Sequence, residues 1–204
     1  GEGGAVFTNN AELKTIAESF RDWGRDCYCP PGKDNTCSKR FCWKLGNLPE
    51  GYDHKYTYSH LGYNLKRTDM QAACGVAQLQ RAAEFVQKRK ENFEFLKTQL
   101  QSCDEYLLLP QATVHSDPSW FGVPIACESQ EQKEFMVDFF ESNRIQTRPY
   151  FAGNILLHPG FKHLDDYSKY PNANKALSHV FFLGCPPFYN EKVFAYLEEV
   201  MSKW

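Results

Sequence analysis

Apolar residues recur at helical spacing in four stretches of the chain. The first stretch follows Asn10, which can cap a helix, and should end at Gly24. A capping box formed by Thr68 and Gln71 begins the second, which extends to about Gln101 and, at ~1.5 Å per residue, would be about 50 Å long. A helix of that length links two lobes. The apolar positions of the first stretch are Leu13, Ile16, Ala17 and Phe20. Those of the second, which predict core packing, are Met70, Ala73, Ala77, Phe85, Phe93, Leu96 and Leu100.

After this stretch the pattern changes to that of a compact α/β unit. Tyr106–Leu109, Phe121–Ala126 and Val180–Leu183 predict strands. Ser129 and Gln132 cap the third helix, and the fourth helix ends the chain. The apolar positions of these two helices are Phe135, Met136, Phe139 and Phe140, then Val193, Leu197, Val200, Met201 and Trp204.

The chain begins at Gly1, without Met, in a Gly-Glu-Gly-Gly turn that leads into a short β-prone run. A strand at the terminus has nothing before it to pair with. We therefore expect the chain to be cut from a larger protein, which would leave apolar surface uncovered. The residues expected to be exposed in this way are Val6, Phe7, Phe20 and Trp23.

Composition and charge narrow the class of protein. The chain has 204 residues, 42% of them hydrophobic and 24% charged, as in globular proteins with a core. A net charge of −2 gives no reason to expect nucleic acid or an anionic membrane as a partner. No apolar run approaches the roughly 20 residues that span a bilayer. Long helical patterns argue against a small disulfide scaffold despite eight cysteines, so we expect a cytoplasmic protein.

Four cysteines form the densest chemistry in the sequence. Cys27, Cys29, Cys37 and Cys42 follow the spacing C-x-C-x7-C-x4-C in a loop rich in Pro, Gly, Asp, Asn and Lys. Thiolates on one loop suit a soft metal, and the C-x-C spacing favours iron–sulfur over structural zinc. A disulfide pair is the alternative that the spacing leaves open.

Three further segments carry a family resemblance. The Gly-Glu-Gly-Gly-Ala-Val opening, the run from His60 to Ala73 (HLGYNLKRTDMQAA) and the run from Arg148 to Asn154 (RPYFAGN) resemble the nucleotide-sugar aminotransferases and dehydrases of the fold-type I PLP proteins. This implies the C-terminal part of an α/β, aspartate aminotransferase-like fold. Residues 1–67 would be the tail of the large cofactor-binding domain, 68–102 a linking helix and 103–204 the small domain.

The cysteine insertion is similar to that of the family's 3-dehydrases, which implies a specific reaction. The expected substrate is CDP-4-keto-6-deoxyglucose, whose C3 hydroxyl is removed on the way to a 3,6-dideoxysugar of lipopolysaccharide. The implied cofactors are pyridoxamine or pyridoxal 5′-phosphate and a [2Fe–2S] cluster. The implied partners are a flavin and iron–sulfur reductase and a second copy of the chain. The catalytic base is expected upstream of Gly1, so the chain alone should be inactive.

The resemblance also assigns roles to individual residues. Cys27, Cys29 and Cys37 match three cluster ligands, and the fourth is expected well upstream. Cys42 is then expected to be a packed thiol without a ligand role. Asn64 matches a residue that binds the cofactor phosphate of the neighbouring subunit.

The substrate site is implied to include Arg148, Asn154 and Phe121. Arginine suits a diphosphate because its guanidinium can make two parallel hydrogen bonds. His60 and His158 are near these segments, and we expect both to have structural roles.

Two other functions are compatible with the sequence. One is a PLP-dependent aminotransferase of the same family with incidental cysteines, distinguished by Lys in place of His just before Gly1. The other is a zinc-binding interaction module, distinguished by zinc in place of iron and sulfide.

Overall fold

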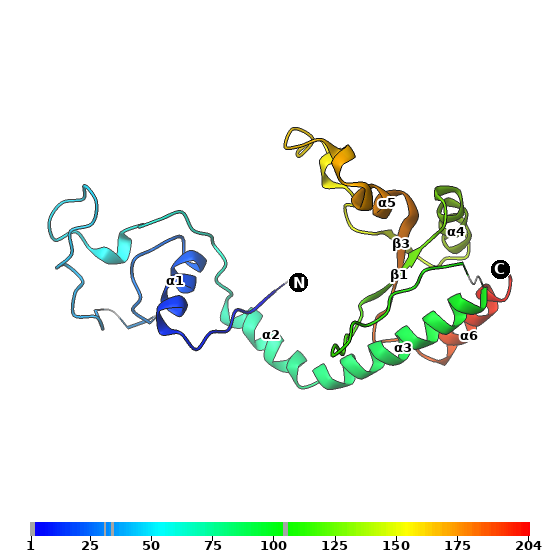
Figure 1. The fold of residues 1–204 in the computed structure, drawn as a ribbon. Helices are drawn as coiled ribbons and strands as arrows, with labels where there is room; N and C mark the ends of the chain where they lie inside the picture. The colour runs from blue at the N-terminus through cyan, green and yellow to red at the C-terminus, as the bar shows by residue number, and fades with distance from the viewer. Residues whose placement is uncertain (1–2, 31, 34, 104–105) are drawn as a thin grey trace. The chain divides into compact units, whose positions relative to one another are not determined.

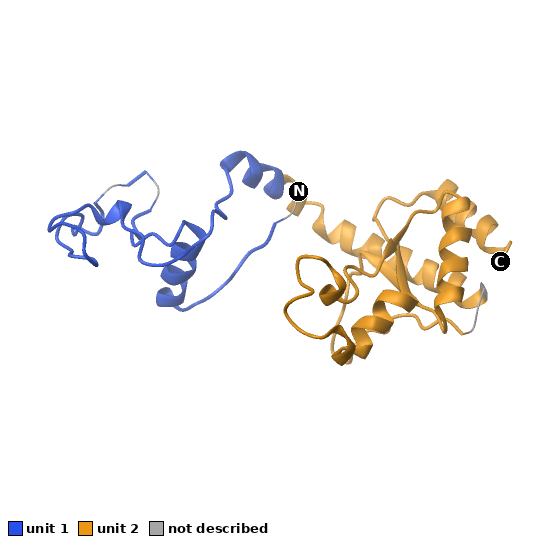
Figure 2. Cartoon of the chain, turned by 90° about the horizontal axis from the view of Figure 1, so that it is seen from above, with its two compact units in different colours: residues 1–76 blue, residues 77–204 orange. Residues whose placement is uncertain are grey.

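The computed structural model describes residues 3–30, 32–33, 35–103 and 106–204. Two compact units make up the chain, Gly1–Val76 and Ala77–Trp204, here called the N-terminal and C-terminal units (Figure 2). The boundary between them falls within helix α2 (Asp69–Leu79).

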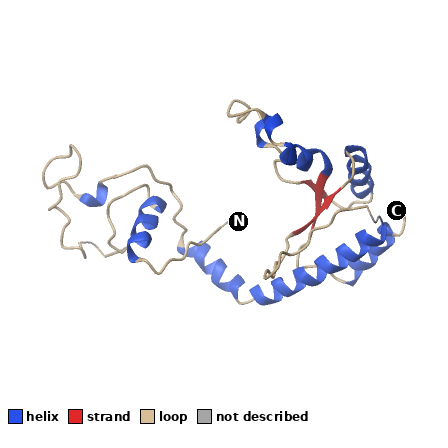
Figure 3. Ribbon diagram, viewed as in Figure 1, coloured by secondary structure: helices blue, strands red, loops and turns tan. Residues whose placement is uncertain are grey.

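The N-terminal unit is mostly irregular around a single early helix (Figure 3). Helix α1 (Ala11–Arg21) begins where the sequence predicts, because Asn10 Oδ1 accepts the first free backbone N–H groups of the helix. The short 3₁₀ helix η1 (His54–Tyr56) follows later. Residues 3–8 have no regular structure, so the predicted strand is wrong: among the described residues no strand pairs with them. Val6 and Phe7 are 86% and 90% exposed, as expected.

The chain crosses itself where the segment after η1 returns to the end of α1. The Trp23 N–H donates to the Tyr63 carbonyl at 2.9 Å. A Cβ on Gly62 would lie 2.1 Å from the amide nitrogen of Gly24, and a Cβ on Gly24 would lie 2.0 Å from the carbonyl oxygen of His60. Gly24 also has a φ of +78°, which side chains disfavour. Both positions therefore require glycine for this crossing.

Two helices occupy the stretch where the sequence predicts one. The capping box is confirmed, since the Thr68 N–H donates to Gln71 Oε1 at 2.8 Å and the Gln71 N–H to Thr68 Oγ1 at 3.3 Å. However, α2 ends and α3 (Ala82–Cys103) begins anew after the turn Gln80–Arg81, so the single long helix is wrong. The turn contains no Gly or Pro. Instead, the Arg81 guanidinium binds Glu84 in the first turn of α3, where the helix dipole favours a carboxylate.

The C-terminal unit is a three-stranded antiparallel sheet with helices on one face (Figures 1 and 3). Its strands are β1 (Gly122–Ala126), β2 (Thr147–Pro149) and β3 (Val180–Gly184), in the order β1-β3-β2. Helices α3, α4 (Gln130–Ser142) and α6 (Glu191–Met201) share one hydrophobic core with the inward side chains of β1 and β3. The largest fully buried side chains of this core are Phe140, Phe181, Leu96, Leu100, Ile125 and Met136.

Several sequence predictions for this unit need correction. The Tyr106–Leu109 segment forms only one bridge, from Leu108 to Ala126, so it is not a strand. Strand β2 and helix α5 (Pro171–His179) were not expected from the sequence pattern. Two 3₁₀ turns, η2 (Ile155–Leu157) and η3 (Tyr167–Lys169), lie in the loop before α5. Met70, expected in a core, is 79% exposed. None of the helices in the described ranges combines the length and apolar character needed to cross a bilayer.

Candidate functional site

The cysteine loop brings three of its thiols near one another. Cys29 is close enough to both Cys27 and Cys37 for each to influence its pKa, so the three sulfurs selected from the sequence are neighbours. All three are half-buried and free. Gly32 and Asn35, which lie between Cys29 and Cys37, have positive φ angles, and these bends help return the third sulfur toward the first two.

The thiols differ in acidity. The Thr36 hydroxyl, which hydrogen-bonds the sulfur, lowers the pKa of Cys29 to about 7, and the backbone N–H of Cys37 adds to the effect. Burial has the opposite effect at Cys27, where it raises the pKa. Cys29 is therefore present as thiolate near neutral pH more readily than Cys27.

The Cys37 sulfur is approached by two nitrogens. The backbone N–H of Lys39 donates to it at 3.4 Å, and His54 Nε2 lies 3.3 Å away. His54 is only 1% exposed, and its ring packs on Trp43 with the ring centroids 4.8 Å apart. A buried imidazole thus lies against the cysteine loop at Cys37.

An ion pair fastens the turn that carries His54 to the cysteine loop. Arg40 donates from Nε and Nη2 to Asp53 Oδ2 at 2.9 and 2.7 Å, and the His54 N–H donates to the Arg40 carbonyl at 3.2 Å. The Arg40 guanidinium holds the pKa of the Asp53 carboxyl below its usual range. Asp53 in turn caps η1 by accepting the Lys55 N–H at 3.0 Å.

Cys42 lies apart from this group. Its side chain is exposed in this chain, and the expectation of a packed thiol in the intact enzyme stays a prediction. Nor do three His, Cys, Asp or Glu side chains in the described residues already stand in the geometry that encloses a metal ion. Three neighbouring thiols are nevertheless a donor set of the right chemistry for an iron–sulfur cluster, one sulfur short of the usual four.

Asn64 lies at the backbone crossing of the N-terminal unit. Its backbone forms a bridge with Asp22, while its side chain is exposed and has no hydrogen-bond partner among the described residues. The side-chain amide is therefore available to donate to an anion such as a cofactor phosphate.

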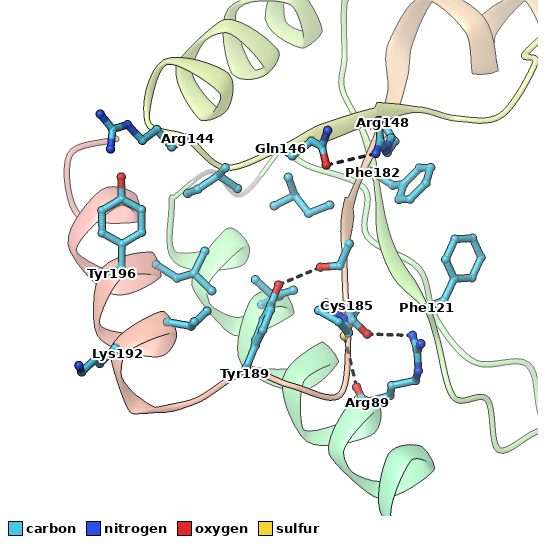
Figure 4. A pocket seen from close by; sticks show the side chains of 17 residues that line it. Arg89, Phe121, Arg144, Gln146, Arg148, Phe182, Cys185, Tyr189, Lys192 and Tyr196 are labelled. Carbon is cyan, nitrogen blue, oxygen red and sulfur yellow. Dashed lines mark hydrogen bonds between the residues drawn. The ribbon is translucent and has the colours of Figure 1, made fainter. Parts of the chain in front are cut away.

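A cavity of about 830 Å³ lies beside β3 in the C-terminal unit (Figure 4). Its walls combine core side chains with the phenol rings of Tyr189 and Tyr196, and it falls in the size range of small-molecule sites. The charged residues of its described lining are all cationic: Arg89, Arg144, Arg148 and Lys192. They are spread around the cavity in Figure 4, so they give it a positive rim rather than a single anion-binding point.

Arg148 and Phe121, both expected at a substrate site, line this cavity. Arg148 pairs with Phe182 across β2 and β3, which places both on the sheet face opposite the core helices. Phe121 packs edge-on against Phe182, with the ring centroids 5.6 Å apart, and Phe151 completes an aromatic group at 5.9 Å from Phe182. Gln146 Oε1 accepts a hydrogen bond from the Arg148 guanidinium at 3.2 Å.

Asn154 is not among the residues that line the cavity. It is 2% exposed, and its amide donates to the Tyr167 carbonyl and to Asn174 Oδ1 at 3.2 and 2.6 Å. Its Oδ1 accepts the Leu156 N–H at 3.0 Å, which caps η2. All these contacts hold the loop between β2 and α5.

The two histidines also have local partners. His60 Nε2 lies 3.3 Å from Ser19 Oγ, and its ring packs on Phe20. His158 Nε2 lies 3.0 Å from the Ala152 carbonyl. The sequence analysis missed His54 and the other cationic residues that line the cavity with Arg148. Each of these residues belongs to an irregular segment or to a different element, and it joins its site only in the folded chain.

Comparisons with known proteins identify the family. The model of the DegT/DnrJ/EryC1/StrS aminotransferase family matches residues 1–201. Two curated relatives align along the whole chain. The lipopolysaccharide biosynthesis protein RfbH of Salmonella typhimurium strain LT2 is 54% identical over 208 residues, which cover 100% of this chain and 47% of that protein. The dTDP-4-dehydro-2,6-dideoxy-D-glucose 3-dehydratase of Saccharopolyspora spinosa is 45% identical, with 100% and 45% covered.

A solved structure supports the fold. E. coli GDP-4-keto-6-deoxy-D-mannose-3-dehydratase with bound hydrated PLP matches with a TM-score of 0.66 at 21% identity, over 95% of this chain and 48% of that chain. The expected fold class, part of the α/β fold of these PLP-dependent proteins, is thereby confirmed. The chain spans about half the length of the curated relatives it matches.

Proposed function

Because the chain belongs to the DegT/DnrJ/EryC1/StrS aminotransferase family, we propose that it is part of a PLP-family 3-dehydrase that removes the C3 hydroxyl of a nucleotide-linked 4-keto-6-deoxy sugar. The observation that carries this proposal is the proximity of the thiols of Cys27, Cys29 and Cys37 on one loop. An aminotransferase has no need of such a group. The similarity to RfbH supports a role in lipopolysaccharide biosynthesis, and the similarity to a 3-dehydratase supports the reaction.

In this proposal the three thiols hold a [2Fe–2S] cluster, and a fourth cysteine comes from outside the loop. Pyridoxamine phosphate bound to the enzyme would supply an electron sink for loss of the C3 hydroxyl, and a cluster held by these thiols would supply single-electron transfer from a flavin and iron–sulfur reductase. The residues of the loop keep the sulfurs together and favour thiolate at Cys29. The free thiols of the described cysteines agree with the reducing cytoplasm in which we place the enzyme.

Asn64 would contribute to the cofactor site of a neighbouring subunit. Its free amide supplies a neutral donor to a phosphate dianion, and this role requires a homodimer. The catalytic base would be supplied by the part of the enzyme outside this chain, so we expect the chain alone to be inactive.

The nucleotide would bind in the C-terminal unit. Arg148 can pair with a diphosphate, and the aromatic group at Phe121 gives a base or sugar an apolar surface. We propose CDP-4-keto-6-deoxyglucose as the substrate. Asn154 would act here only by holding the loop that follows Arg148, because its own amide is occupied.

Cluster analysis of single variants tests the proposal. The full-length protein, reconstituted with iron and sulfide without oxygen, should hold one [2Fe–2S] cluster, and Cys27→Ser, Cys29→Ser or Cys37→Ser should abolish it. Cys42→Ser is the matched control and should keep the cluster. Iron, acid-labile sulfide and visible absorption report the result. Stoichiometric zinc without sulfide would instead support a structural metal module.

Substrate assays test the sugar nucleotide. Turnover should be fastest with the CDP-linked 4-keto-6-deoxy sugar and slower with the dTDP- and GDP-linked sugars. Arg148→Ala should raise KM about tenfold if its guanidinium binds the diphosphate, the equivalent of ~1.4 kcal/mol. Faster turnover of another nucleotide would correct the substrate, and an unchanged KM would remove Arg148 from the site.

The family match also supports a second function, amino transfer to the 4-keto sugar. Production of an amino sugar from glutamate, with full rate in the cysteine variants, would favour it over deoxygenation.

A further inference from the structure

We propose that His54 directs an N–H at the Cys37 sulfur and thereby sets the reduction potential of the cluster. The inference rests on the cluster proposed above. It assigns to His54 the part of a positioning residue, which acts on the cluster through a ligand without binding iron itself.

The contact is built into the unit. His54 Nε2 lies 3.3 Å from Cys37 Sγ, within the range of a hydrogen bond to sulfur. The ring is almost fully buried and packs at a tilt on Trp43, whose ring is in turn 6.2 Å from that of Tyr28. A histidine held in this way cannot turn its ring without disturbing the aromatic packing.

The surroundings of the ring decide which nitrogen carries the proton. Nδ1 is buried and has no hydrogen-bond partner among the described residues. A buried N–H without an acceptor is rarer in proteins than a buried acceptor without a donor. The proton therefore belongs on Nε2, and His54 donates to Cys37 rather than accepting from its thiol.

Cys37 thus receives two N–H donors, from His54 and from the backbone of Lys39. Hydrogen bonds to a ligating sulfur stabilise the more negative, reduced state of the cluster and raise its potential. The ion pair between Arg40 and Asp53 holds the donor in place, because it joins the turn before His54 to the cysteine loop.

Three variants of the full-length, reconstituted protein test this inference. His54→Met removes the donor and keeps an apolar side chain of similar length, whereas His54→Gln keeps an N–H₂ that can reach the sulfur. His60→Met is the matched control, an identical change at a histidine in the same unit that contacts Ser19 and Phe20 instead of a cysteine. The midpoint potential is measured by dye-mediated titration followed by electron paramagnetic resonance.

We expect His54→Met to lower the midpoint potential, with the equilibrium constant for reduction falling about tenfold, or ~59 mV for one electron. His54→Gln should restore most of this difference, and His60→Met should leave the potential unchanged. Loss of the cluster in His54→Met with retention in His54→Gln also supports the donor. Equal potentials in all four proteins, or equal losses in both His54 variants, would overturn the inference.

Pulsed electron paramagnetic resonance of ¹⁵N-histidine protein separates donor from ligand. A hydrogen-bonded His54 should give a weak nitrogen coupling that disappears in His54→Met. A strong coupling, typical of nitrogen bound to iron, would make His54 a ligand and overturn the inference. A wild-type protein without iron and sulfide would instead refute the proposed function.

Discussion

The two units are held together by different interactions. Within the described residues, every buried apolar side chain belongs to the C-terminal unit, where helices and strands share one core. The buried side chains of the N-terminal unit are polar, His54 and Thr57. This unit depends on backbone hydrogen bonds, a glycine crossing, an ion pair and tilted contacts between rings. Its apolar side chains are instead largely exposed, as Val6 and Phe7 are.

This difference predicts which kind of substitution destabilises each unit. A hydrophobic core is damaged by lost volume and tolerates polar changes at its surface. A unit built on close backbone contacts is damaged by one added methyl group. Removing side-chain volume from the C-terminal core and adding a methyl group at the glycine crossing of the N-terminal unit should therefore each destabilise one unit only.

The largest effect is expected from Leu100→Ala in the C-terminal core. Leu100 is 0% exposed, and truncating it leaves a cavity that should cost about 2–5 kcal/mol of unfolding free energy. Urea unfolding followed by tryptophan fluorescence measures the loss. Leu79→Ala is the control, because Leu79 is 73% exposed and the same change should stay within about 0.5 kcal/mol. Equal losses of unfolding free energy in the two variants would show that Leu100 is not part of the core.

A smaller effect, confined to the other unit, is expected from Gly62→Ala. The new Cβ would meet the Gly24 amide at 2.1 Å, so the crossing must open, at a cost of more than about 1 kcal/mol. Hydrogen exchange should accelerate at residues 58–65 and stay unchanged in the C-terminal unit.

Gly75→Ala is the matched control for this prediction. A Cβ at Gly75 meets nothing within 4 Å, and alanine favours the helix by about 1 kcal/mol. Protection of α2 should therefore hold or increase. Unchanged exchange in Gly62→Ala would show that the two segments do not approach each other this closely.

The smallest effect concerns the reactivity of one thiol in the metal-free protein. Removing the Thr36 hydroxyl with Thr36→Val should move the pKa of Cys29 from about 7 toward its ordinary value of 9.0. Less thiolate is then present at pH 7, so alkylation by iodoacetamide should slow several-fold. Thr36→Ser keeps the hydroxyl and should react like the parent protein.

Cys185 serves as the internal reference for that experiment. Burial raises its pKa to about 11, so it should stay unlabelled in the folded protein. Labelling of Cys185 before Cys29 would contradict the assigned acidities. Peptide mass spectrometry of the labelled cysteines, taken over time at pH 7, measures both.

The sequence predicts the C-terminal unit better than the N-terminal one. The local sequence pattern predicts the helix caps at Asn10 and Ser129, the strands β1 and β3, and the last helix. Caps have typical residue types, and buried faces place apolar residues at regular spacing. Strand β2 escapes because three residues ending in Pro149 are too short for a period to show. The break at Gln80–Arg81 escapes because an ion pair, not Gly or Pro, marks it.

The residues of the cysteine site likewise differ in whether the sequence could reveal them. Cys27, Cys29 and Cys37 could be selected from spacing, since cysteines on one loop stay close in any fold of that loop. His54 could not, because its neighbours Asp53 and Lys55 give it the pattern of a surface residue. His54 lies beside the Cys37 sulfur only because the chain folds back there, where Arg40 forms an ion pair with Asp53.

The glycine crossing has a consequence for how the protein can evolve. Gly24 and Gly62 each exclude a side chain because of the backbone of the other segment, not because of a side chain there. No substitution at one position can therefore compensate for a change at the other, since glycine is already the smallest residue. The pair should be invariant together rather than covary. Methods that infer contacts from correlated substitutions would then find no signal where the two segments of this unit approach most closely.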